Sequence, residues 1–398
     1  MNANCEKKVF RKEFDDRLRS GLIDALELFE FHKIRITKLL TGESAIKMIV
    51  QMKNAILIVI LLTVLMSPSR NNAQAKNGPS FDCTRASNVV EKTICASSAL
   101  SQMDRKLSDS YRASLVLLSE DGKVSLQNGQ RQWIKVTREV CDRTSFPKLP
   151  YIPTTEQCLE KHYGERQKQL EDAVHEYGGI KIRRVDTFEA HRSESKSEYS
   201  GSDVGFDTTY ISYPQIDAPK SHQEELWNKK MADIAKSLAG MDEEGGDVDY
   251  DSDYSILSVS TRLISVDLSG GFYAHGTPHG QYAMSTVNWL LNEGREMQVD
   301  DVFDKTKPWQ TVVLKYCFDD LSKRDDYWVN PTNNHVVIEL GDMPLETRRW
   351  AFQKEGLRIQ FQPYEVAAYA YGAPAVVIPW DVLGQYLVAD PPFREPNR

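Results

Sequence analysis

The sequence lacks the short motifs that mark common hydrolases and nucleotide-binding enzymes. It contains no Gly-x-Ser-x-Gly nucleophile elbow, no glycine-rich phosphate loop and no His-Glu-x-x-His zinc motif. We therefore expect no catalytic residues, no cofactor and no enzymatic activity. The missing motifs do not exclude a catalytic pair of carboxylates from distant parts of the sequence.

Long hydrophobic runs are also missing. The most apolar segment runs from Ala55 to Met66, well short of the roughly 20 residues that span a bilayer. It follows Lys53 and precedes Ala73-Gln74-Ala75, a small-x-small pattern that signal peptidase accepts. We expect residues 52–75 to be a secretory signal peptide and the mature chain to be periplasmic, beginning at Lys76. A retained membrane anchor is the alternative, and no lipobox precedes a cysteine.

A signal peptide belongs at the start of a chain, yet residues 1–51 precede this one. They include Cys5 and a charged helical pattern. We expect a mis-assigned start, with translation beginning at Met52 or Met48. The alternative is a cytoplasmic extension, which would make the protein a single-pass inner-membrane protein with its C-terminal part outside.

Basic residues are outnumbered by acidic residues beyond the predicted signal. Residues 1–75 carry 12 Lys and Arg against 8 Asp and Glu, which leaves 37 against 49 in the remainder, a net charge of −12. Such a balance repels nucleic acid and attracts a basic protein. We expect no nucleic-acid partner, and contact with the membrane only through the signal peptide unless it is retained.

The chain has six cysteines and no Cys-x-x-Cys pair. Cys83, Cys95, Cys141 and Cys158 lie in one segment without paired histidines nearby, which favours two disulfides over a metal site. Three pairings are open. We favour Cys83 with Cys95 and Cys141 with Cys158, since these would join helix ends. Cys317 stands in an apolar helical context that is typical of a buried thiol.

Residues 81–175 have the apolar period of helices. Apolar side chains recur every three to four residues from Leu100 to Leu118, and a second such pattern ends near Cys141. Thr154 and Gln157 form a capping-box signature before a third pattern. A domain of this size buries little apolar surface, so disulfides would supplement its stability. We expect a small disulfide-stapled all-α domain.

Short motifs surround the four cysteines of this segment. They are Phe81-Asp82-Cys83, Val90-Glu91-Lys92-Thr93-Ile94-Cys95, Leu100-Ser101-Gln102-Met103-Asp104, Gln132-Trp133 and Cys158-Leu159. With this order of cysteines, residues 81–175 resemble the LprI-type lysozyme-inhibitor family. The resemblance implies lysozyme inhibition, an activity assigned to a minority of that family.

A change in composition marks a boundary after residue 175. The chain becomes rich in glycine, serine and charge, so we expect a linker over residues 176–206, with an exposed hairpin as the alternative. Over residues 207–390, strand-type and helix-type patterns alternate, which predicts an α+β domain. The expected strands are 208–213, 256–268, 282–291 and 356–361, and the expected helices are 222–238, 309–323 and 363–369.

The second region carries its own set of motifs. They are Tyr213-Pro214-Gln215, Gly294-Arg295-Glu296-Met297, Phe361-x-Pro363-Tyr364-Glu365-Val366 and Ile378-Pro379-Trp380. Residues 206–390 resemble, through these motifs, the extracellular domain of RsiV-type anti-sigma factors. That family includes a sensor that captures lysozyme, whereas other members are attached to deacetylases or have no assigned role.

Two features of this region are typical of metal sites but lack the full pattern. His275 and His279 are four residues apart, yet Pro278 and the neighbouring glycines preclude a helix. We expect both histidines in an exposed or partner-facing turn between two strands. The alternating acids from Asp247 to Asp253 lack the glycine and glutamate of an EF-hand, so we expect a solvated loop. No metal site is therefore expected.

Two unrelated resemblances point to the same partner and support one functional hypothesis. We expect a periplasmic binding protein that captures or inhibits lysozyme-type muramidases, or that binds another cell-wall component. Its contacts would come from acidic and aromatic surface. The candidate contacts are His275, His279, Tyr282, Tyr364, Tyr369 and Tyr371. The alternatives are a membrane-anchored lysozyme or envelope-stress sensor of anti-sigma type, and a cell-wall-processing accessory protein or enzyme.

Overall fold

The computed structural model describes residues 78–144, 152–193, 203, 205–239, 247–329 and 339–394. Residues 1–51 and the predicted signal peptide at 52–75 lie outside this range. Within the described part of the chain, no helix combines the length and the apolar character needed to cross a membrane.

The N-terminal part is a layer of helices. It consists of the short η1 (Cys83–Arg85), α3 (Val89–Ala96), α4 (Ser98–Leu117), α5 (Glu120–Val140) and α6 (Thr155–Glu171). The α-helices begin where the side chains of Asn88, Ser97, Ser119 and Thr154 accept backbone hydrogen bonds, and the predicted capping box at Thr154 is confirmed.

Both favoured disulfides are confirmed. Cys83 bonds Cys95 and Cys141 bonds Cys158. The first ties η1 to α3, and the second links the end of α5 to the first turn of α6. The helical layer is therefore stapled at two helix ends.

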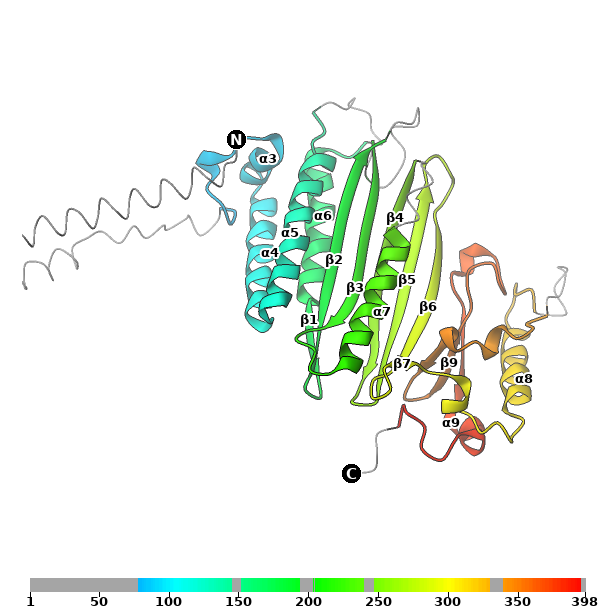
Figure 1. Ribbon diagram of the computed structural model, residues 1–398. Coiled ribbons are helices and arrows are strands. Elements are labelled where there is room, and N and C mark those ends of the chain that lie inside the picture. Colours follow the sequence, from blue (N-terminus) through cyan, green and yellow to red (C-terminus); the bar gives the residue numbers. More distant parts are fainter. Residues whose placement is uncertain are drawn as a thin grey trace, which may run out of the picture. The chain divides into compact units, whose positions relative to one another are not determined.

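A seven-stranded sheet follows, with its strands in the order of the chain from β1 to β7 (Figure 1). Neighbouring strands are antiparallel except β3 and β4, which are parallel because α7 (His222–Ala239) crosses over between them. The strands are β1 (Val174–Tyr177), β2 (Ile180–Arg192), β3 (Phe206–Ile216), β4 (Val248–Val259), β5 (Leu263–Ala274), β6 (Gln281–Leu290) and β7 (Arg295–Glu296).

The C-terminal part forms a smaller unit beside β6. Its sheet has the order β10-β9-β8 and packs with α8 around one apolar cluster that includes Phe303, Trp309 and Trp350. Its elements are η3 (Val299–Asp301), α8 (Trp309–Leu321), η4 (Met343–Leu345), η5 (Thr347–Arg349), β8 (Trp350–Phe352), β9 (Gly356–Gln360), η6 (Tyr369–Tyr371), β10 (Ala375–Pro379), α9 (Trp380–Leu383) and η7 (Gly384–Tyr386). The predicted fold class, stapled helices followed by α+β structure, is confirmed.

The helical layer packs directly on the large sheet. Phe188 of β2 and Phe206 of β3 belong to the same apolar cluster as Trp133 and Tyr163 of α5 and α6. A second cluster joins Trp227 of α7 to strand residues from β2 to β6. The helices and both sheets thus lie within one compact unit, residues 75–398.

The expected linker is wrong for the first part of residues 176–206, where the alternative, a hairpin, is found. Residues 174–192 form β1 and β2, and Gly178 and Gly179 make the hairpin turn with φ of 55° and 86°. A turn of this kind uses the freedom of glycine at positive φ. Ile180 and Ile182 alternate with polar side chains and fill the core, so a strand is favoured once a partner strand is present.

Three further expectations are wrong in detail. The predicted strand at 256–268 is two strands, β4 and β5, with a turn between Val259 and Leu263. The predicted helix at 363–369 is a turn followed by the single-turn η6. The aspartates of the expected acidic loop lie on β4, apart from Asp247, which comes just before it.

Candidate functional site

Four of the six predicted contact residues form one group at the surface, in which His279 and Tyr364 are exposed and Tyr282 and Tyr369 half-buried. We call it the aromatic loop cluster. It consists of His279 in the β5–β6 turn, Tyr282 at the start of β6, and Tyr364 and Tyr369 in the segment between β9 and β10. The β hairpin and this segment are about 85 residues apart in the chain. The fold brings them together because the small sheet packs beside β6.

Tyr369 is the centre of the cluster. Its ring stacks on His279 with the centroids 4.2 Å apart, meets Tyr282 edge-on at 5.9 Å and lies 5.5 Å from Tyr364. Its hydroxyl donates to the Gly280 carbonyl at 2.7 Å. Stacked and edge-on rings at these distances are mutually stabilising. The cluster is therefore a defined surface rather than four independent side chains.

Buried polar contacts fix the segment that carries Tyr364. The side chain of Gln362 bonds both the N–H and the carbonyl of Met284 on β6, at 2.8 and 2.7 Å. Glu365 accepts two hydrogen bonds from the buried Arg349 at 2.6 and 2.8 Å. Burial opposes ionisation of Glu365, but the Arg349 guanidinium holds its pKa below the usual value. The segment is thus held before any partner binds.

The backbone at Tyr364 is unusual. Its φ is +67°, a region that non-glycine residues rarely adopt and that costs on the order of 1 kcal/mol or more. The side chain is nevertheless 46% exposed. Gly372 closes the segment at φ +69°, where a Cβ would lie 3.2 Å from the Tyr282 hydroxyl. Strained backbone is enriched at ligand-binding sites, so this conformation makes Tyr364 a candidate contact residue.

A groove adjoins the cluster. A cavity of about 600 Å³ is bordered by Tyr282, Tyr369, Phe272 and Asp251. It shares Phe272, Asp251 and Tyr282 with a second cavity of about 690 Å³ that continues beneath α7. The surface at the end of the β5–β6 hairpin therefore combines exposed aromatic rings with a recess that has an acidic border.

The other two candidates lie apart from the cluster. Tyr371 points to a different neighbour, since its hydroxyl donates to Asp326 at 2.8 Å and its ring meets Tyr327 at 5.5 Å. The hydrogen bond to Asp326 raises the pKa of Tyr371. The expectation that His275 is exposed is wrong, because its side chain is fully buried against Asp207 and Asp249. Whether a side chain in a turn is exposed or buried therefore cannot be read from its position in the turn alone.

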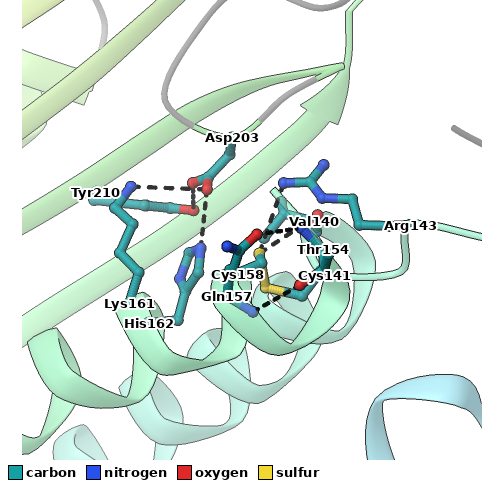
Figure 2. The surroundings of a disulfide bond; sticks show 10 residues. All are labelled: Val140, Cys141, Arg143, Thr154, Gln157, Cys158, Lys161, His162, Asp203 and Tyr210. Carbon is teal, nitrogen blue, oxygen red and sulfur yellow. Dashed lines mark hydrogen bonds and ion pairs between the residues drawn. A yellow bond between two sulfur atoms is a disulfide. The ribbon is translucent and has the colours of Figure 1, made fainter. Parts of the chain in front are cut away.

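A polar centre that the sequence did not indicate lies next to the second disulfide. Figure 2 shows His162 and Tyr210 directed at the carboxylate of Asp203, beside Cys141 and Cys158. The distances to Asp203 are 2.9 Å from His162 Nε2 and 2.6 Å from the Tyr210 hydroxyl. His162 and Asp203 are buried and Tyr210 is half-buried, so this centre joins α6 to the sheet rather than facing a partner.

Cys317 matches its prediction. The thiol is buried in α8, and burial raises its pKa to about 12. A thiol of this kind is unreactive at neutral pH.

Comparison with known proteins supports the class of the helical region. Residues 83–170 match the family described as lysozyme inhibitor LprI, and residues 300–381 match DUF3298, a protein family of unknown function. The predicted LprI-like domain is thus confirmed at family level. The expected similarity to RsiV-type domains stays a prediction, with which the DUF3298 match is compatible.

Individual relatives are distant. Lipoprotein LprI of Mycobacterium bovis and of Mycobacterium tuberculosis is 24% identical over 112 residues, which is 28% of this chain and 51% of the relative. The chain therefore spans about half the length of these curated relatives. Crystal structures of DUF3298 family members from Bacteroides fragilis and Pseudomonas aeruginosa are 13% and 12% identical, each with a TM-score of 0.38. They align with 54% and 53% of this chain and with 96% and 95% of their own.

Proposed function

We propose that this protein is an exported binding protein that captures a lysozyme-type muramidase. The match of residues 83–170 to the lysozyme-inhibitor family carries the proposal. Two disulfides in that region favour an oxidising compartment outside the cytoplasm. Inhibitors act by binding, which agrees with a sequence that lacks the common catalytic motifs.

The aromatic loop cluster is the contact surface that we propose, because it lies in residues 206–390, the region that resembles a family with a lysozyme-capturing sensor. Tyrosine and histidine rings provide large, amphipathic contact area, and tyrosine is enriched at the energetic centres of interfaces. Because Gln362 and Glu365 already hold the segment in place, little ordering entropy is lost on binding. The net charge of −12 beyond residue 75 favours encounter with a basic enzyme.

The direct test is binding of hen egg-white lysozyme to the purified chain, measured by calorimetry at low salt, together with inhibition of cell-wall lysis. Tyr364→Ala removes an exposed ring and is expected to weaken binding about 30-fold, the loss of a 2 kcal/mol contact. Phe318→Ala is the matched control, because Phe318 is 42% exposed on α8, outside the cluster. A folded wild-type chain that neither binds nor inhibits lysozyme would overturn the proposed function.

A second pair of variants tests which region makes the contact. Val116 on α4 and Val124 on α5 are exposed apolar side chains of the helical layer, at 82% and 55%. Val116→Ser combined with Val124→Ser is expected to leave binding unchanged. If this pair weakens binding and Tyr364→Ala does not, the helical layer is the contact surface and the role of the cluster is refuted.

A further inference from the structure

Three strand ends meet at the edge of the large sheet from which the β5–β6 turn projects. Asp207 lies at the start of β3, Asp247 immediately precedes β4, and His275 immediately follows β5. One ligand atom from each lies within 4.8 Å of the others. The backbone N–H of His275 donates to the Asp247 carbonyl at 2.8 Å, which holds two of the three ends together.

The imidazole of His275 is the unusual member of this group. Its side chain has no exposed area, and neither ring nitrogen makes a hydrogen bond within the described part of the chain. Buried polar atoms are normally satisfied, so each exception requires an explanation. Its Nδ1 is directed at Asp207 Oδ1, 3.5 Å away, and its Nε2 at Asp249 Oδ2, 3.3 Å away.

These distances favour a shared ion over a direct ion pair. A buried imidazolium between carboxylates would form charge-assisted hydrogen bonds of about 2.8 Å. Ligand atoms that are about 2 Å from a tetrahedral zinc ion are roughly 3.4 Å from each other. The separation of 3.5 Å between Nδ1 of His275 and Oδ1 of Asp207 corresponds to that edge.

The surrounding groups are those that orient metal ligands. Asp249 accepts hydrogen bonds from the N–H and the hydroxyl of Thr208 at 3.0 and 2.8 Å, so its carboxylate is fixed opposite His275 Nε2. A carboxylate at that position favours the tautomer that leaves Nδ1 free to bind a metal. Ser193 donates to Asp247 Oδ1 at 2.7 Å and positions that carboxylate as well.

We propose that Asp207, Asp247 and His275 bind one divalent transition-metal ion of the zinc type. One imidazole and two carboxylates form a three-ligand set that suits such an ion, with a water completing a tetrahedron. Calcium is disfavoured because it takes oxygen ligands. The ion ties the ends of β3, β4 and β5 together and fixes the turn that carries His279. This site departs from the expectation that the chain binds no metal.

The test uses the purified chain after chelation and dialysis, titrated with zinc chloride by calorimetry. One equivalent per chain is expected, and His275→Ala and Asp207→Asn are expected to weaken binding at least 10-fold. Asp251→Asn is the matched control, since Asp251 lies on β4 outside the group, and it is expected to leave binding unchanged. Circular dichroism of each metal-free variant checks folding.

Spectroscopy of the wild type keeps the test decisive if a variant fails to fold. When cobalt replaces zinc, we expect the visible absorption bands of a tetrahedral site. X-ray absorption of the zinc form is expected to show one imidazole among oxygen ligands. The proposal is overturned if the folded wild type binds no zinc, if folded His275→Ala binds zinc as tightly as the wild type, or if calcium binds and zinc does not.

Discussion

Loss of the Asp186 side chain on β2 is expected to destabilise this fold strongly. Its carboxylate is buried and accepts hydrogen bonds from Arg166 on α6 at 2.6 Å, from Arg184 at 2.6 Å and from Ser212 at 2.7 Å. Burial opposes its ionisation, but the two guanidinium groups hold its pKa below the usual value. The pair of Arg166 and Asp186 is a buried ionic link between the helical layer and the sheet.

The magnitude follows from what each arginine retains. In Asp186→Ala, Arg184 keeps its ion pair with Asp253 at 2.9 Å, but Arg166 keeps only neutral partners, the amide oxygens of Gln130 and Gln169 and the face of the Phe188 ring. Arg166 thus becomes a buried charge without a counter-ion, which costs about 3–5 kcal/mol. Asp186→Asn keeps an acceptor but loses the charge, so about half of that loss is expected.

Urea unfolding at pH 7, followed by circular dichroism with the disulfides intact, measures these losses. Arg166→Met in the Asp186→Ala background removes the stranded charge and is expected to restore most of the stability. The reasoning is refuted if Asp186→Ala costs less than about 1 kcal/mol, or if the double variant is no more stable than Asp186→Ala alone.

Three further outcomes are expected. Replacing Cys141 and Cys158 by serine opens a crosslink that spans 17 residues and is expected to cost about 3 kcal/mol in urea unfolding; an unchanged midpoint would contradict this. Burial opposes the charge of Asp203, but hydrogen bonds with His162 and Tyr210 hold its pKa well below the usual range. A pKa that is lower in the folded than in the unfolded chain adds stability above about pH 4, and this stability is lost as the pH falls. In Asp203→Asn, the free energy of unfolding, measured by urea unfolding at several pH values, is therefore expected to fall less steeply below about pH 4 than in the wild type. Cys317 is expected to resist iodoacetamide at pH 8 in the native chain and to react in urea, as read by mass spectrometry.

Local patterns in the sequence were sufficient for the helical region. Helix period, the capping box at Thr154 and the spacing of the four cysteines depend on residues close together in the chain, and the structure confirms all three. The buried thiol of Cys317 likewise follows from its apolar helical neighbours. Such features need no knowledge of distant contacts.

Strand assignments depended on partners that the sequence does not identify. Residues 180–192 appeared polar enough for a linker, because Arg184 and Asp186 occupy positions that face the helices. Their charges are buried only because Arg166 of α6 and Ser212 of β3 satisfy them. Tertiary contacts therefore decided that this segment is a strand.

By itself, the sequence determined which residue types could form a binding surface at the β5–β6 turn and at the segment that carries Tyr364 and Tyr369. Only the tertiary structure decided that His279 stacks on Tyr369 while His275, four residues earlier, turns inward toward Asp207. The physical reason is that a turn reverses the chain and sends nearby side chains to opposite sides. Which side is exposed depends on strands that are distant in the sequence.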